Sequence, residues 1–182
     1  MFTIVFYIIY LYMLYRFISK AYKLEELSPL EARVMPKFAF IMLLIHMEWR
    51  LSQLLLLIPI FLVSLAIAYL QVSRVDIQDK GEQDKHGRPI ILIQKNTPYI
   101  IGWFLVVLAG VLLALVFEGE HLSTSHFVQE LFTEVRKESL RYFFFSQNAN
   151  WYIWALTTFT NFTFTRLLIW KCPAIKEAIR KK

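Results

Sequence analysis

The sequence predicts an all-α integral membrane protein with about four transmembrane helices and one interfacial amphipathic helix. Of its 182 residues, 57% are hydrophobic, and the mean hydropathy is +0.47. The apolar residues are gathered in runs of about 18 or more, which as helices cross a hydrocarbon core of roughly 30 Å. The length suits a single polytopic membrane domain over residues 1–182.

Four apolar runs are the expected spans, and polar segments separate them. The spans are residues 2–18, 51–72, 99–117 and 150–170, the polar segments are 19–37, 73–98 and 118–149, and a basic tail covers 171–182. No basic stretch precedes the first run, and the residues after it are bulky and charged. This pattern favours a retained span over a cleaved signal peptide.

The longest apolar stretch, residues 38–72, contains His46, Glu48 and Arg50 in its first half. The about thirteen residues before Leu51 are too few to cross a bilayer. We therefore expect them to form an interfacial lead-in, with Trp49 at headgroup level and Arg50 reaching water as an anchor.

The distribution of Lys and Arg residues along the chain suggests a second arrangement of residues 38–72. The basic tail 171–182 places the C-terminus in the cytoplasm, and counting back through four spans places the basic segment 73–98 there too. The same count leaves five Lys and Arg residues of the first loop outside, against the positive-inside rule. In the alternative, the N-terminus is outside and residues 38–72 form a re-entrant hairpin that turns near Pro59, which requires non-helical backbone at membrane depth.

Two segments are suited to contacts between helices or with partners. The span 99–117 has a stripe of small residues that lets another helix approach closely, and it includes Gly102, Ala109 and Gly110. The segment 126–145 has apolar residues at helical spacing, among them Phe127, Leu131 and Phe132. We expect this segment to form an amphipathic helix in the interface or against a partner.

The fourth span is unusually polar for a membrane helix. Asn161, Thr163 and four further threonines lie within it, and Trp151 and Trp170 bracket it as interfacial anchors. We expect the polar residues to hydrogen-bond to neighbouring helices. The functional alternative is a helix that lines a substrate path.

Composition and spacing argue against several functions. The net charge of +6 belongs to the ends of the spans, so nucleic-acid binding is not expected. The single cysteine, Cys172, excludes an intramolecular disulfide and a multi-cysteine metal site. The spacing of Glu118, Glu120, His121 and His126 fits no zinc motif. We expect no enzyme activity, no cofactor and no metal.

The pattern in 50–76 resembles the second span of a family of four-span inner-membrane proteins that integrative and conjugative elements encode, a domain of unknown function. The positions that fit are Arg50, Leu51, Pro59, Phe61, Leu62, Arg74 and Asp76. Two features depart from the family, which has a larger external segment after its first span and a short turn in place of 118–149. The resemblance implies an accessory or structural protein of a conjugation or type IV secretion machine, with no catalytic residues.

Taken together, these features predict a non-enzymatic subunit of a larger membrane complex in a bacterial inner membrane, with other integral membrane proteins and lipid as its partners. One alternative is a membrane immunity or exclusion protein that acts through its external segments. Another is a small transporter or channel subunit in which His46 and Glu48 form a proton or ion site, with Arg50 as the counter-charge.

Overall fold

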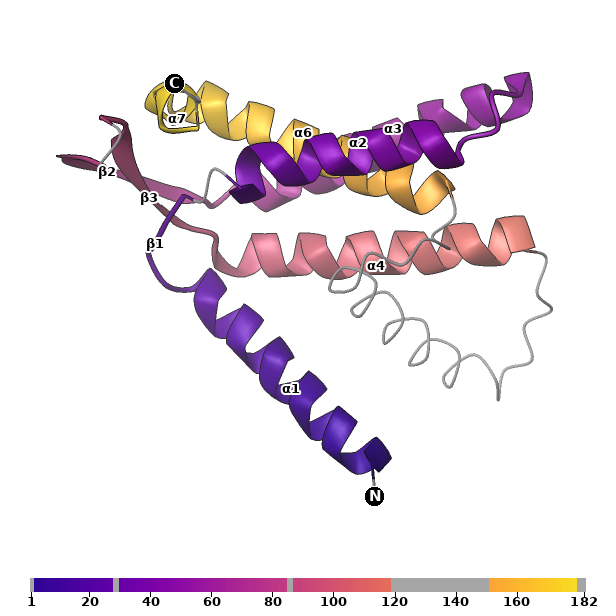
Figure 1. Cartoon of the computed structure of the whole chain (residues 1–182), viewed down its shortest axis with the longest axis horizontal. Coiled ribbons are helices and arrows are strands. Elements are labelled where there is room, and N and C mark those ends of the chain that lie inside the picture. The colour runs from indigo at the N-terminus through magenta and orange to yellow at the C-terminus, as the bar shows by residue number, and fades with distance from the viewer. Residues whose placement is uncertain (1, 28–29, 85–86, 119–150, 180–182) are drawn as a thin grey trace.

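The computed structural model describes residues 2–27, 30–84, 87–118 and 151–179, which are mostly helical (Figure 1). The helices are α1 (Phe2–Ala21), α2 (Met35–His46), α3 (Leu51–Val72), α4 (Asn96–Glu118), α6 (Trp151–Lys171) and α7 (Ala174–Ala178). A five-residue π-helical turn, η1 (Leu30–Val34), precedes α2. The strands are β1 (Glu25–Glu26), β2 (Asp76–Gln83) and β3 (Pro89–Gln94).

A bundle of four helices forms the body of the described structure. Helix α6 packs chiefly against α3 and α2, and α3 also packs against α4. Figure 1 shows these four helices running along one common axis, whereas α1 diverges from them below α4. Two described helices are long and apolar enough to cross a membrane, Leu51–Val72 and Asn96–Ala114. Their positions agree with the expected second and third spans.

A small sheet closes one end of the bundle, and it corrects the all-α prediction. The strands pair antiparallel in the order β1-β3-β2, with Glu25 opposite Ile93 and Ile77 opposite the same residue on the other side. Segment 73–98 was predicted as polar, and β2 is indeed almost wholly exposed. The β2 sequence lacks the alternation of apolar and polar residues that predicts a strand. Its strand conformation therefore depends on pairing with β3.

The β2–β3 hairpin is irregular near its tip. Gly81 has a φ of 67°, and the register shifts between Asp79 and Gln83. Left-handed backbone of this kind favours glycine because a Cβ would be strained there. The exposed neighbour Glu82 raises the pKa of Lys80 by a hydrogen bond and by its charge.

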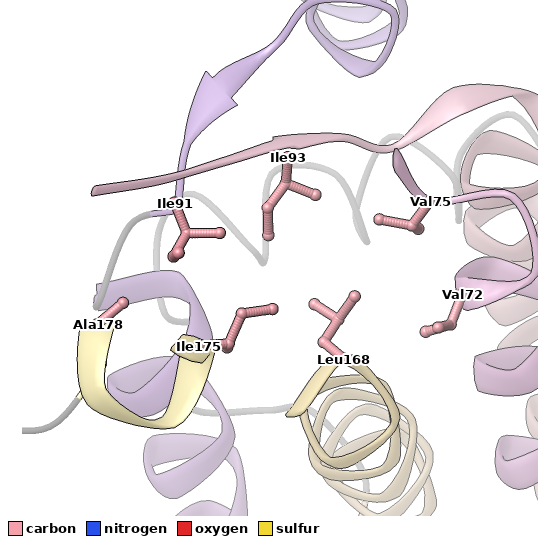
Figure 2. Close-up of a cluster of buried hydrophobic side chains, with 7 residues drawn as sticks. All are labelled: Val72, Val75, Ile91, Ile93, Leu168, Ile175 and Ala178. Carbon is pink, nitrogen blue, oxygen red and sulfur yellow. The ribbon is translucent and has the colours of Figure 1, made fainter. Parts of the chain in front are cut away.

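The sheet is fixed to the bundle by a buried apolar cluster, shown in Figure 2. Ile91 and Ile93 point from β3 toward Leu168 of α6 and Ile175 of α7. The remaining members are Val72, Val75 and Ala178. Lys171 at the end of α6 adds a polar link, because its Nζ donates to the carbonyls of Val72 and Ser73, where α3 ends. A cation at a helix C-terminus is favourable.

Residues 38–72 form two helices that run in opposite directions. Near the sheet, the Thr165 hydroxyl of α6 donates to the Ala32 carbonyl at 3.3 Å. At the far end of α6, Met47 belongs to the same buried cluster as Tyr152. The chain therefore travels the length of α6 before α3 begins at Leu51 and returns toward the sheet (Figure 1).

The expected interfacial lead-in stays a prediction, but its residues are packed within the bundle. Helix α2 packs along α6 and buries Ala39 and Leu43, so it belongs to the bundle. The chain reverses direction within residues 38–72, as in the hairpin alternative, but it does so at residues 47–50 and not near Pro59. Pro59 lies inside the continuous helix α3. The sequence did not indicate this because residues 38–45 of α2 are all apolar and show no preferred buried face, and the neighbour α6 is about a hundred residues away in sequence.

Candidate functional site

Four polar residues of α6 share one face of the helix. Thr157, Thr160, Asn161 and Thr165 line a common cavity together with Phe164. Their spacing of three and four residues places them one above another along a helix. Thr157 and Thr160 are buried, so this face is turned into the protein and away from any outside partner.

The cavity has a volume of about 230 Å³ and lies at the sheet end of the bundle. Helix α3 contributes Gln71, α4 contributes Tyr99 and Trp103, and α1 contributes Phe17. Lys95, between β3 and α4, lines it as well. The cavity is therefore built from segments spread over most of the described chain.

Aromatic rings cover the cavity on the side of α1 and α4. The ring centroid of Phe17 is 6.2 Å from that of Tyr99 and 5.0 Å from that of Trp103. The Tyr99 ring also lies 5.5 Å from Phe164 of α6. The Nζ atom of Lys95 is 4.8 Å from the Tyr99 centroid, a cation–π contact that keeps the charge beside the cavity.

The polar groups inside the cavity differ in whether they have a hydrogen-bond partner. Asn161 Nδ2 donates to the Thr157 carbonyl at 2.9 Å, one turn earlier. The Thr160 side chain is 4% exposed, and its hydroxyl has no hydrogen-bond partner among the described residues. A buried hydroxyl without a partner is costly. Because Thr160 lines the cavity, a bound polar group would relieve this cost.

Gln71 lies on Gly102 of α4 and is 5% exposed. A Cβ placed on Gly102 would be 2.2 Å from Gln71 Cγ, so only glycine leaves room for this side chain. Gly102 was predicted as a helix contact, and the structure places it between α4 and α3. Its immediate neighbour across the interface is a polar side chain that lines the cavity.

The other predicted contact residues have different surroundings. Ala109 packs against the buried cluster at the far end of the bundle. A Cβ on Gly110 would meet nothing within 4 Å, and Thr163 is partly buried. The predicted amphipathic helix, with Phe127, Leu131 and Phe132, lies outside the described residues.

The predicted interfacial anchors divide into exposed and packed residues. Trp49 and Trp170 are 62% and 80% exposed. Trp151 is partly buried and lies 5.6 Å from the ring of Phe117. Arg50 occupies the N-cap position of α3 and pairs with Glu48 at 3.2 Å on the exposed surface.

The two residues of the alternative proton or ion site, His46 and Glu48, have different surroundings. His46 Nδ1 lies 2.9 Å from the Met42 carbonyl, one turn earlier in α2, and its ring is 6.2 Å from that of Trp154. Glu48 is instead exposed beside Arg50. Neither His46 nor Glu48 lines the cavity. Among the described residues, no group of three or more His, Cys, Asp and Glu could hold a metal ion.

Sequence reasoning missed Lys95, Gln71, Tyr99 and Trp103 as cavity residues. One signal was available, because Gln71 is a polar residue near the end of a long apolar run, and such residues face protein or water. The other three sit at a span boundary, where basic and aromatic residues are common for reasons of anchoring alone.

The chain matches no protein-family model, no curated protein and no solved structure. The geometry of the described residues therefore carries the functional argument. The resemblance of residues 50–76 to a conjugation-associated family stays a prediction.

Proposed function

We propose that the chain is a polytopic integral membrane protein whose sheet end lies in the cytoplasm. Support comes from apolar side chains that face outward. In the most apolar windows of α3 and α4, only 22% and 28% of residues are buried. Leu62 of α3 and Leu112 of α4 are among the exposed large side chains. A helix in the core of a soluble protein would bury such residues, whereas lipid solvates them.

The distribution of positive charge supports the orientation. The sheet end gathers Lys and Arg residues from three parts of the chain that the contacts of β1, β3, α6 and α7 bring together. They include Lys20, Lys23, Arg33, Arg74, Lys80, Arg88, Lys95, Lys171 and Lys176. At the opposite end, Arg50 is the one Lys or Arg residue among those that the structure describes. The positive-inside rule therefore favours a cytoplasmic sheet end.

In this orientation the first polar loop no longer violates the rule. Residues 19–37, 73–98 and the start of the tail share one end, because β1 pairs with β3 and Arg33 donates to the Ile179 carbonyl of the tail at 3.4 Å. The proposed arrangement keeps α1, α3, α4 and α6 as full-length spans. The chain crosses once more between α1 and α3, through η1, α2 and the residues 47–50, where Met47 and Arg50 are extended, because α2 alone, about 18 Å long, is shorter than the hydrocarbon core.

Within the membrane, we propose a non-enzymatic role as an assembly or accessory subunit of a larger complex, such as a conjugation or type IV secretion apparatus. The observation that supports it is the position of α1, which diverges from the bundle (Figure 1). Leu11, Tyr12 and Tyr15 are exposed on it. We propose that a transmembrane helix of a partner subunit packs on this face, because tyrosine rings at a contact offer both apolar area and a hydrogen-bonding group.

The experiment is affinity purification of the tagged full chain from detergent-solubilised membranes, after a carbonate wash that removes peripheral proteins. We expect the chain to resist the wash and to bring down integral membrane partners in fixed ratio. Replacing both Tyr12 and Tyr15 with alanine should weaken partner binding about thirtyfold and so reduce recovery of those partners, because about 1 kcal/mol is expected from each well-packed ring.

The matched control is Tyr69→Ala, which removes an exposed ring from α3 and should leave partner recovery unchanged. Release of the chain by carbonate would contradict the membrane proposal. A chain that resists the wash but elutes alone would contradict the assembly role only.

A further inference from the structure

We propose that the cavity at the sheet end, lined by Lys95, Gln71, Thr160 and Trp103, binds the anionic phosphate head group of a membrane lipid. The proposal rests on the proposed insertion in a membrane and adds a ligand site to it. Three features of the cavity point to this ligand: its charge, its unsatisfied donor and its size.

The charge and the polar groups of the cavity suit an anion. Lys95 lines it, and no carboxylate does so among the described residues. Lys95 directly precedes α4, whose first turn has no acidic residue, so the positive end of the helix dipole lies on the same side. The Thr160 hydroxyl is buried without a partner and can donate to a phosphate oxygen.

The size and position favour a lipid head group over a larger ligand. A volume of about 230 Å³ is below the roughly 300–1,000 Å³ of pockets for drug-sized molecules. It accepts a glycerol phosphate group but leaves acyl chains outside. On α4, the exposed apolar side chain of Ile101 lies in sequence between the cavity residues Tyr99 and Trp103. Tyr99 and Trp103 have the amphipathic rings typical of headgroup level.

Lipid titrations monitored by native mass spectrometry test the site on the full chain in a neutral detergent. The probes are dioleoyl phosphatidylglycerol, dioleoyl phosphatidylcholine and soluble glycerol 3-phosphate. We expect one phosphatidylglycerol to bind about tenfold more tightly than phosphatidylcholine, because the cation and the donors act on an anionic head group. We expect glycerol 3-phosphate alone to bind much more weakly than phosphatidylglycerol.

Two variants separate the site from general charge and packing. Lys95→Gln should weaken phosphatidylglycerol binding about tenfold, whereas Lys176→Gln, on the exposed side of α7, removes the same charge and should change it less than about twofold. Thr160→Val should weaken binding about threefold and yet raise the unfolding temperature, because it removes a buried hydroxyl that lacks a partner. A role in packing alone predicts the rise in temperature without the loss of binding.

Equal binding of the two lipids, or equal effects of the two lysine variants, would overturn the proposal. Glycerol 3-phosphate binding as tightly as the lipid would overturn the lipid assignment. The failure of the membrane proposal is seen separately, as release of the chain by carbonate, since the titration does not depend on that wash.

Discussion

At the scale of single residues, two glycines of α4 have opposite surroundings. Gly102 lies under the Gln71 side chain, where a Cβ would be 2.2 Å from Cγ, and Gly110 has open space at the same position. Both belong to the small-residue stripe that the sequence offers for helix packing. Only at Gly102 is glycine needed, because there the buried side chain of Gln71 from α3 lies too close to α4 for a Cβ to fit.

We predict that Gly102→Ala lowers the free energy of unfolding by about 1–3 kcal/mol, since the new methyl group forces Gln71 to move within a packed interface. Adding Gln71→Ala should restore most of the loss. The measurement is chemical unfolding in detergent, analysed as a double-mutant cycle.

Gly110→Ala serves as the control and should leave stability unchanged or raise it by up to about 1 kcal/mol, because alanine is the better helix former. If Gly102→Ala and Gly110→Ala changed the free energy of unfolding equally, the close contact with Gln71 would not explain the effect at Gly102.

At the scale of elements, a single residue joins the sheet to α4. Asn96 has a φ of 62°, and its Nδ2 donates to the Arg74 carbonyl at 2.8 Å and to Asp76 Oδ2 at 2.9 Å. The side chain thus ties the start of β2 to the start of α4. Asparagine is one of the few side chains that tolerates left-handed backbone, so both its conformation and its amide are used.

We predict that Asn96→Ala destabilises the chain by about 2 kcal/mol, through left-handed strain and the loss of two hydrogen bonds. Asn96→Gly should cost about 1 kcal/mol, because it also loses the two hydrogen bonds but glycine adopts the left-handed conformation without strain. Thermal unfolding of both variants in the same detergent gives the comparison. An alanine variant as stable as the glycine variant would exclude a contribution from the backbone conformation.

At the scale of the whole molecule, the direction of α2 decides which polar segments share a side. The lead-in arrangement separates Lys23 from Glu82 by the membrane. The hairpin of α2 and α3 places both at the sheet end, with Trp49 at the opposite end. The contacts of β1 with β3 support the hairpin arrangement that we propose.

Single cysteines at Lys23, Glu82 and Trp49, introduced with Cys172→Ala, test this arrangement with a membrane-impermeant maleimide. We predict that the cysteines at 23 and 82 react from the same side and that the cysteine at 49 reacts from the other. A cysteine at Lys176 is the control and should react with the first two. Reaction of 23 together with 49 would restore the lead-in arrangement.

Much of this fold follows from local pattern. The helix Leu51–Val72 has the bounds predicted for the second span, and the third and fourth predicted spans differ from α4 and α6 by a few residues. Long apolar runs predict helices well because each hydrogen bond of a helix is local. The pairing of β1 and β2 with β3 is not local, since it joins segments far apart in sequence, and β2 has little strand pattern of its own.

By itself, the sequence determined the helical and largely apolar character of this chain, the bounds of α3, and the presence of a polar face on α6. Only the tertiary structure decided that α2 returns along α6, that a sheet closes one end, and that the α6 face lines a cavity with Lys95 and Gln71. The physical reason is that these features depend on side chains brought together across the whole chain, and periodicity within one segment carries no information about its neighbours in space.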